Sequence, residues 1–283
     1  MKFEIASELA YEIHSPTTLL INIHALRSPG QTIIEETFNI EPYIRIEELT
    51  SIHYENRFIR LEVEEGTNLN ISYKAIVDAS HKIIDQRELE AVPVVALDGN
   101  VIPFLFPSRY CQSDKLSTLA YKEFGHISNV YEKVLAIVDW IYENVDYVSG
   151  STNSQTSAYD TITERTGVCR DFAHLGIALC RALTIPARYF TGYSYKLNPP
   201  DFHACFEAYI GGQWLIFDAT RLAPLNGLVK IANGRDAADA SIASIFGRYT
   251  SNGITVSCRA LDDNFVPFTH ENAYHKAIAV NAI

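Results

Sequence analysis

The residues with the clearest chemical potential in this chain are a cysteine, a histidine and an aspartate that lie far apart in the sequence. Cys169 follows Gly167 by two positions and is followed by an arginine, an aspartate and an apolar helical pattern, so we predict that it begins a helix. The start of a helix carries partial positive charge and unpaired N–H groups, which stabilise a thiolate. Cys169 is therefore a candidate nucleophile, although many free cysteines are simply small buried hydrophobic residues.

The pattern beyond this helix predicts a β-hairpin. Two runs with the period-two alternation of strands, His203–Ile210 and Gln213–Asp218, are separated by Gly211 and Gly212. A Gly-Gly pair between such runs favours a two-residue turn. The length of the turn decides which residues face each other, and one residue more or less would move every side chain to the other face.

This hairpin brings a histidine close to a carboxylate. Cys205 faces Asp218 and His203 faces Thr220, so His203 and Asp218 are diagonal neighbours on one face of the sheet. A histidine can accept the proton of a thiol, and a carboxylate beside it fixes the tautomer of the ring and supports its charge. We therefore interpret Cys169, His203 and Asp218 as a catalytic triad. Taken singly, the histidine could bond a backbone carbonyl and the aspartate could be a turn residue.

Other polar residues near these three have competing interpretations. His174 lies five positions along the helix from the cysteine and points away from it, so we expect a structural role. Asp171 suits the first turn of a helix but would oppose a thiolate, so we expect it to be structural too. Arg170 could favour the thiolate or be solvated. Asp201 could replace the predicted aspartate as the orienting group, and Cys205 is a second thiol near the site.

Composition and charge define the class of protein and exclude several partners. The chain has 283 residues, of which 47% are hydrophobic and 20% charged, as in a globular protein large enough for two domains. A net charge of −11 argues against nucleic acid and against an anionic membrane surface as partners. We expect no signal peptide and no membrane span, because no stretch is apolar enough for either. Five widely spaced cysteines without a C-x-x-C pair indicate neither a disulfide framework nor a zinc site. These features fit a cytoplasmic protein that needs no cofactor, and they carry no signal for an oligomeric state.

The periodicities predict an α+β fold with two domains. Residues 1–95 read as an antiparallel β-sandwich, because strand-like segments alternate with turn signals at about ten-residue spacing. Residues 96–127 read as an apolar, extended connector interrupted by prolines. Residues 128–283 read as helices packed on an antiparallel sheet, which would be the catalytic domain.

The predicted elements are as follows. Strands are expected at Lys2–Ile13, Thr17–Leu26, Thr32–Ile40, Arg57–Glu64, Asn68–Val77, Ala187–Lys196 and Gly253–Leu261, besides the two of the hairpin. Helices are expected from Asn129 to about Val145, from Asp160 to Arg165 with Gly167 ending it, and from Cys169 to Leu183. Gly234–Asp239 is expected to be an ordered loop or a short helix.

These residues resemble the core of the transglutaminase-like superfamily, and more narrowly its bacterial cysteine proteases with an N-terminal β-domain. The matching blocks, in order, are Thr166–Ala173, Ile185–Tyr189, His203–Tyr209 and Trp214–Thr220. Pro107–Tyr110 and Gly234–Asp239 resemble family segments on either side of the core. The resemblance implies a papain-like fold in which Cys169 is the nucleophile, His203 the base and Asp218 the orienting group. Cys205 departs from the family pattern, because many members carry tryptophan there.

The resemblance implies acyl transfer at an amide or peptide carbonyl through a thioester. The backbone N–H of Cys169 is a candidate oxyanion donor. Because water is always present, we expect hydrolysis of a protein or peptide substrate, as by a cysteine protease or amidase. Transamidation of protein glutamine is the alternative, and it needs a site that excludes water. A catalytically silent binding or scaffold protein is another, although the intact triad speaks against it. Acyl transfer from a thioester donor, as in arylamine acetyltransferases, fits these residues less well.

Overall fold

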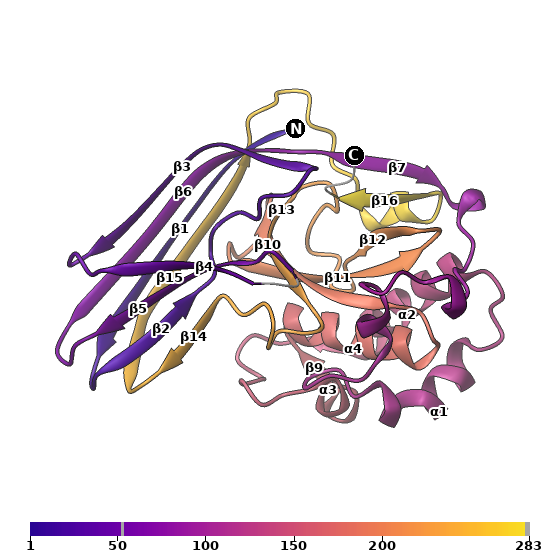
Figure 1. The fold of residues 1–283 in the computed structure, drawn as a ribbon. Helices are drawn as coiled ribbons and strands as arrows, with labels where there is room; N and C mark the ends of the chain where they lie inside the picture. The colour runs from indigo at the N-terminus through magenta and orange to yellow at the C-terminus, as the bar shows by residue number, and fades with distance from the viewer. Residues whose placement is uncertain (52–53, 281–283) are drawn as a thin grey trace.

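Two four-stranded antiparallel sheets form the first part of the fold, on the left in Figure 1. The computed structural model describes residues 1–51 and 54–280. The strand orders are β15-β1-β6-β3 and β14-β2-β5-β4. The bounds are β1 (Lys2–Ile13), β2 (Thr17–Ile21), β3 (Gln31–Glu41), β4 (Ile46–Thr50), β5 (Arg57–Val63), β6 (Asn68–Ala79), β14 (Ala243–Phe246) and β15 (Tyr249–Ala260). The predicted N-terminal domain of antiparallel strands is confirmed.

Alternation along these strands builds the core of the first part. In β1 the side chains of Phe3, Ile5 and Leu9 are buried while their neighbours are more exposed, and the same period-two pattern recurs in β6. Such alternation turns one face of a strand toward the apolar interior and the other toward water. The pattern in the sequence therefore locates the core of these sheets.

The chain returns to these sheets near its end. β14 pairs with β2, and β15 pairs with β1 along almost the whole of both strands. The division into residues 1–95, 96–127 and 128–283 stays a prediction. The pairing shows that residues from the last of these segments complete both sheets of the first, which no local pattern in the sequence indicates.

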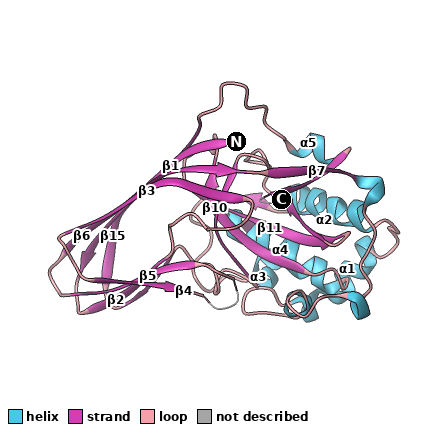
Figure 2. Cartoon of the chain, turned by 45° about the horizontal axis from the view of Figure 1, so that its top comes forward, coloured by secondary structure: helices cyan, strands magenta, loops and turns pink. Residues whose placement is uncertain are grey.

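A third antiparallel sheet, of order β12-β11-β10-β13, lies beside the helices. Its strands are β10 (Ala187–Ser194), β11 (Phe202–Ile210), β12 (Gln213–Phe217) and β13 (Leu228–Gly234). The helices are α1 (Ser113–Phe124), α2 (Val130–Asn144), α3 (Ala158–Glu164), α4 (Cys169–Ala182) and α5 (His270–Ala273). Figure 2 shows that all five gather at one end of the molecule. None of the helices in the described ranges is long and apolar enough to cross a membrane.

Short elements connect these parts. They are β7 (His81–Asp85), β8 (Asp146–Tyr147), β9 (Thr166–Gly167), β16 (Lys276–Val280) and the 3-10 turns η1 (Gln86–Glu88), η2 (Val94–Ala96) and η3 (Ile102–Leu105). β7 pairs with β16, and β8 pairs in parallel with β9. β9 lies directly before α4, so its pairing with β8 helps to fix where that helix begins.

Helix α4 lies in the interior of the second part. Its residues from Asp171 to Arg181 are all buried. Gly176 allows the closest approach to the sheet, because a Cβ there would lie 2.5 Å from the ring of Phe206. The helix that begins with Cys169 is thus held rigidly against β11, the strand that carries His203.

Two expected elements differ in the structure. The connector is not extended throughout, because it contains η3 and the helix α1, whose buried residues Leu116, Ala120 and Phe124 form a short i, i+4 stripe. The helix expected at Asp160–Arg165 is α3, which begins at Ala158 and is terminated by Arg165 in a left-handed conformation with φ 60°, not by Gly167. Gly167 lies instead in β9.

Candidate active site

The hairpin has the register that the Gly-Gly turn predicts. Phe206 pairs with Phe217 and Ile210 with Gln213. Gly211 and Gly212 have φ of 60° and 77°, the positive pair that a type I′ turn requires and that glycine adopts without strain. The predicted turn length is therefore right, and the expected register holds along the ladder up to the pair of Phe206 and Phe217.

His203 and Asp218 meet at this open end in a buried ion pair. His203 Nε2 lies 2.8 Å from Asp218 Oδ2, and the two residues are 1% and 3% exposed. The other oxygen, Oδ1, accepts hydrogen bonds from the Thr220 backbone N–H at 2.9 Å and from its hydroxyl at 2.7 Å. The carboxylate is thus fixed on both sides and holds the imidazole by one nitrogen.

The charges in this pair stabilise each other. Burial lowers the pKa of His203, but the charge of Asp218, the neighbouring Cys205 and contacts with Asp218 and Cys169 outweigh it, so the pKa is well above its usual value. Burial raises the pKa of Asp218, but the charge and hydrogen bond of His203 and the bonds from Thr220 bring it below its usual value. Each residue of the pair therefore favours the charged form of the other. Nδ1 of the ring makes no hydrogen bond within the described ranges.

Cys169 is the first residue of α4 and is partly exposed, whereas Cys111, Cys180 and Cys205 are buried. Its thiol is close enough to His203 to stabilise the charged ring. The structure therefore brings the three predicted residues together: the cysteine from a helix start, the histidine from a strand and the aspartate from the end of the next strand.

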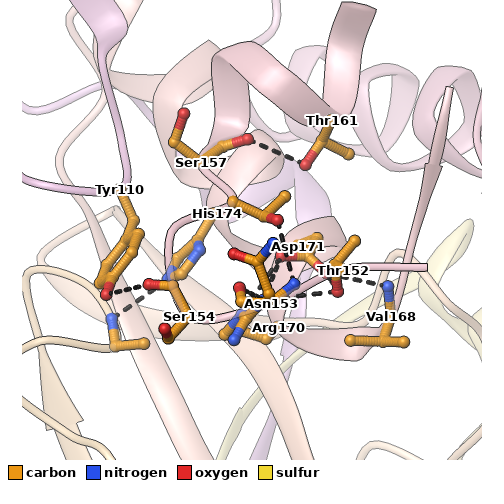
Figure 3. A network of polar contacts seen from close by, with 12 residues as sticks. Tyr110, Thr152, Asn153, Ser154, Ser157, Thr161, Val168, Arg170, Asp171 and His174 are labelled. Carbon is orange, nitrogen blue, oxygen red and sulfur yellow. Dashed lines mark hydrogen bonds and ion pairs between the residues drawn. The ribbon is translucent and has the colours of Figure 1, made fainter. Parts of the chain in front are cut away.

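Asp171 fixes the start of α4, as Figure 3 shows. It is fully buried, and its Oδ2 accepts the backbone N–H of Val168 at 3.0 Å and the hydroxyl of Thr152 at 2.8 Å. Arg170 donates to Oδ1 at 3.0 Å and to the carbonyl of Asn153 at 2.7 Å. The expectation that Asp171 is structural agrees with these contacts, and Arg170 is its ion-pair partner.

His174 is fully buried and makes structural contacts, as expected. Its Nε2 accepts the backbone N–H of Ala237 at 3.1 Å, and its ring stacks on Tyr110 with centroids 5.0 Å apart. Burial, together with Arg170 and Arg181, holds its pKa well below the usual value. A neutral, packed ring of this kind joins α4 to the loops around it (Figure 3).

The two remaining competitors have distinct positions. Asp201 accepts the backbone N–H of Phe202 at 2.7 Å, and the carboxylate that accepts a hydrogen bond from His203 is that of Asp218. Cys205 is buried beside the pair, and ligand atoms of His203, Cys205 and Asp218 all lie within 4.8 Å of one another. Burial, followed by the charge of Asp218, raises the pKa of this thiol to about 12.

Tyr147 is a residue of the site that the sequence patterns do not identify. It pairs with Gly167 in the short parallel β8–β9 ladder, and its ring centroid lies 5.8 Å from that of Phe172 on the first turn of α4. Burial and the Cys169 thiol raise the pKa of this partly exposed phenol. They outweigh a hydrogen bond from the Cys169 backbone and the charge of His203, which lower that pKa. The phenol oxygen thus lies beside the backbone N–H of the cysteine. A two-residue strand is too short to give a periodic signal.

A cluster of ion pairs lies on the same face of β11 as His203. Glu207 is fully buried and pairs with Lys230 Nζ at 2.9 Å and with Arg188 Nε at 2.5 Å. Arg188 also lies over the ring of Trp214, 4.2 Å from its centroid. This cluster joins β10, β11, β12 and β13, so it fixes the strand that carries His203.

Comparisons with known proteins agree with this geometry. Residues 1–100 match the family described as the bacterial transglutaminase N-terminal domain, and residues 118–219 match the transglutaminase-like superfamily. The structure named "Putative Cysteine Protease from Cytophaga hutchinsonii" is 65% identical, with a TM-score of 0.97, over 99% of this chain and 97% of that chain. In Mycobacterium leprae, "Uncharacterized protein ML0607" is 26% identical over 202 residues, which is 67% of this chain and 71% of its own length. The chain belongs to the transglutaminase-like superfamily, and a bacterial transglutaminase N-terminal domain precedes its core.

Proposed function

We propose that this protein is a cysteine-dependent hydrolase of amide or peptide bonds. In this proposal Cys169 is the nucleophile, His203 the general base and acid, and Asp218 the group that orients the imidazole. The observation that carries it is the buried His203–Asp218 ion pair, whose second ring nitrogen is free of other hydrogen bonds in the described ranges. A thiol at the start of a rigid helix beside such a ring is the arrangement that activates a cysteine nucleophile.

In the first half-reaction, Cys169 Sγ forms a bond to the carbonyl carbon of the substrate while its proton resides on His203. The oxyanion that develops would accept hydrogen bonds from the Cys169 backbone N–H and from the hydroxyl of Tyr147. The C–N bond then breaks, and His203 transfers its proton to the leaving amine. A thioester on Cys169 remains.

In the second half-reaction, water attacks the thioester. His203 accepts a proton from the water as the C–O bond forms, and it returns that proton to the sulfur as the C–S bond breaks. The carboxylic acid leaves and the free enzyme is restored. No step requires a cofactor or a metal ion.

The choice of hydrolysis over transamidation rests on two supports. The name of the Cytophaga hutchinsonii protein, with 65% identity over nearly the whole chain, points to proteolysis. Cys169 is partly exposed, so water can reach the thioester. Transamidation, in which a primary amine takes the acyl group, is the second candidate because the core belongs to the transglutaminase-like superfamily. Both candidates act on protein or peptide substrates.

A product assay separates these two reactions. Wild-type protein would be incubated with a peptide library and with a glutamine-containing protein, with and without a labelled primary amine. Cys169→Ala removes the nucleophile, and Cys258→Ala in β15 is the matched control. Cleavage or amide hydrolysis that requires Cys169 supports the proposal. Incorporation of the labelled amine without hydrolysis overturns it in favour of transamidation.

Thiol labelling tests activation directly, without a substrate. Burial raises the pKa of Cys111, Cys205 and Cys258 to about 12 and that of Cys180 higher still. Iodoacetamide at neutral pH should therefore modify Cys169 first, since only thiolates react. The rate should fall in His203→Ala. If Cys169 is modified no faster than the other four cysteines, the triad is inactive and the protein is a binding or scaffold protein.

A further inference from the structure

A tight turn directly after β12 fixes the carboxylate of the candidate triad. Asp218 Oδ1 accepts the backbone N–H and the hydroxyl of Thr220, at 2.9 and 2.7 Å. The same hydroxyl accepts the backbone N–H of Leu222 at 3.2 Å, so its own proton is directed at the carboxylate. The backbone N–H of Arg221 donates to the carbonyl of Asp218 at 3.3 Å and closes the turn. These bonds leave Oδ2 for His203.

The last residue of this turn has an unfavourable backbone conformation. Arg221 has a φ of 57°, in the left-handed region that residues other than glycine rarely adopt. Such a conformation persists only where contacts elsewhere hold the residue in place. The contacts that hold Arg221 therefore decide whether Thr220 stays in position to fix Asp218.

The side chain of Arg221 anchors the turn to helix α2. Its guanidinium donates to Asp139 Oδ1 at 2.6 Å and lies over the ring of Tyr142, 4.0 Å from the centroid. Asp139 and Tyr142 are three positions apart on α2, so they share one face of that helix. The two charged side chains are 25% and 28% exposed, and ion pairs near the surface contribute little to global stability. The effect of this pair is therefore expected in the conformation of the turn.

Helix α2 contacts the chain on both sides of the triad carboxylate. Before it, the ring of Phe217 at the end of β12 lies 5.7 Å from that of Tyr131, centroid to centroid. After it comes the anchor at Asp139, whose Oδ1 also lies 2.9 Å from His270 Nε2 and accepts the hydroxyl of Tyr274 at 3.0 Å. The turn is thus held from outside the buried pair that it supports.

We propose that Arg221 is a positioning residue for the base, acting through the turn on Asp218 and through Asp218 on His203. The ion pair with Asp139 keeps the turn closed, and the closed turn keeps both donors of Thr220 on Oδ1. Oδ2 then stays against the imidazole. A carboxylate that is free to rotate would spend less time there and would stabilise the imidazolium less. This role of Arg221 rests on the proposed function, because it concerns the same triad.

Two variants remove the anchor from opposite ends. Arg221→Ala deletes the guanidinium and leaves a left-handed residue without support, while Asp139→Asn removes the charge with which the guanidinium pairs. Arg221→Gly is the third variant, since glycine adopts a positive φ without strain and should keep the turn closed. Tyr274→Phe is the matched control, because it removes another donor to Asp139 Oδ1 and leaves the ion pair intact.

The ring of His203 is titrated by NMR with isotope-labelled histidine, and its signal is assigned by its absence in His203→Gln. The midpoint should fall by at least ~0.5 pH unit in both Arg221→Ala and Asp139→Asn. Charge alone would move it in opposite directions, because losing a nearby cation raises the pKa of a histidine and losing an anion lowers it. The midpoint should lie nearer the wild-type value in Arg221→Gly and should equal it in Tyr274→Phe. With a peptide that the wild type cleaves, kcat should fall at least ~10-fold in Arg221→Ala while KM stays unchanged.

Asp218→Asn separates the role of Arg221 from the proposed function. A midpoint that falls in Asp218→Asn but is unchanged or higher in Arg221→Ala overturns the positioning role and leaves the triad standing. An unchanged midpoint in Asp218→Asn removes the triad assignment and the positioning role with it. A shift in Tyr274→Phe as large as that in Arg221→Ala also overturns the role, since the whole cluster around Asp139 would then be responsible. Urea unfolding at neutral pH shows that each variant is folded, and Arg221→Gly serves if Arg221→Ala is not.

Discussion

His203 Nε2 and Asp218 Oδ2 lie 2.8 Å apart, although His203 is in β11 and Asp218 directly follows β12. The last pair of the β11–β12 ladder is Phe206 with Phe217, and beyond it the histidine reaches the carboxylate along the diagonal of the hairpin. Because Nε2 is bound to the carboxylate, Nδ1 is the nitrogen left for the thiol. The register set by one two-residue turn therefore decides which ring nitrogen faces the carboxylate.

Asp218→Asn should reduce kcat/KM by about 10³–10⁴, because a triad aspartate that loses its charge no longer holds the correct tautomer. The native pKa of His203 is raised well above its usual value, so its proton stabilises the native state below the unfolded pKa, and this stabilisation is lost as pH rises through the folded pKa. Without the carboxylate, burial dominates and that transition moves to lower pH. We therefore expect the alkaline limb of the pH–rate profile to shift downward. Asp201→Asn is the matched control, and an unshifted limb in Asp218→Asn would contradict the assignment.

Tyr147→Phe should lower kcat about 10²-fold, the usual cost of one lost oxyanion donor, while substrate affinity changes little. Alkylation of Cys169 by iodoacetamide passes through no oxyanion, so its rate should stay near the wild-type rate. Tyr159→Phe is the control, because Tyr159 on α3 has similar exposure, 45% against 43%. Equal losses of kcat and of alkylation rate would instead mean that the phenol merely supports the start of α4.

Much of the site could be predicted from the sequence because its signals are local. The Gly-Gly turn set the register of the hairpin, and glycine before an apolar helical pattern indicated that Cys169 begins α4. Alternation located most strands of the sandwich to within a few residues. These features arise from backbone preferences and from the burial of one face of each element. Both leave a pattern within a short segment of the sequence.

The features that the sequence did not predict depend on distant parts of the chain. A strand was expected at Gly253–Leu261, where β15 lies, but its partner was not. Strand β15 completes the first sheet by pairing with β1, and the contact of Tyr147 with α4 depends on the two-residue ladder between β8 and β9. Tertiary pairing fixes such features, and no window of residues contains it.

Asp171→Ala should destabilise the fold by about 3 kcal/mol, because it removes a fully buried carboxylate and leaves the partly buried donors of Val168, Thr152 and Arg170 without their acceptor. Urea unfolding measures the change. The start of α4 should also become less ordered. Iodoacetamide should then no longer modify Cys169 faster than it modifies the other cysteines. Asp114→Ala is the control, since Asp114 is an exposed residue in the first turn of α1. A loss below ~1 kcal/mol would mean that water replaces the carboxylate and that the helix start is fixed by packing alone.

His24→Phe should remove a pH dependence of stability that lies far from the candidate site. His24 is buried between the rings of Phe38 and Tyr73, with centroids 4.7 and 4.6 Å away. Burial, followed by the charge of Arg57, lowers its pKa to about 4.

The native state therefore resists protonation of His24 that the unfolded chain accepts near pH 6.5, and stability is lost as pH falls from about 6.5 to 4. Integrated over that window, the effect is about 3 kcal/mol. Urea midpoints measured across this range should fall steeply in wild type and less steeply in His24→Phe, which keeps an aromatic ring in the same contacts. Parallel curves for the two proteins would show that carboxylates such as Glu36, whose pKa is lowered to about 2, account for the whole acid dependence.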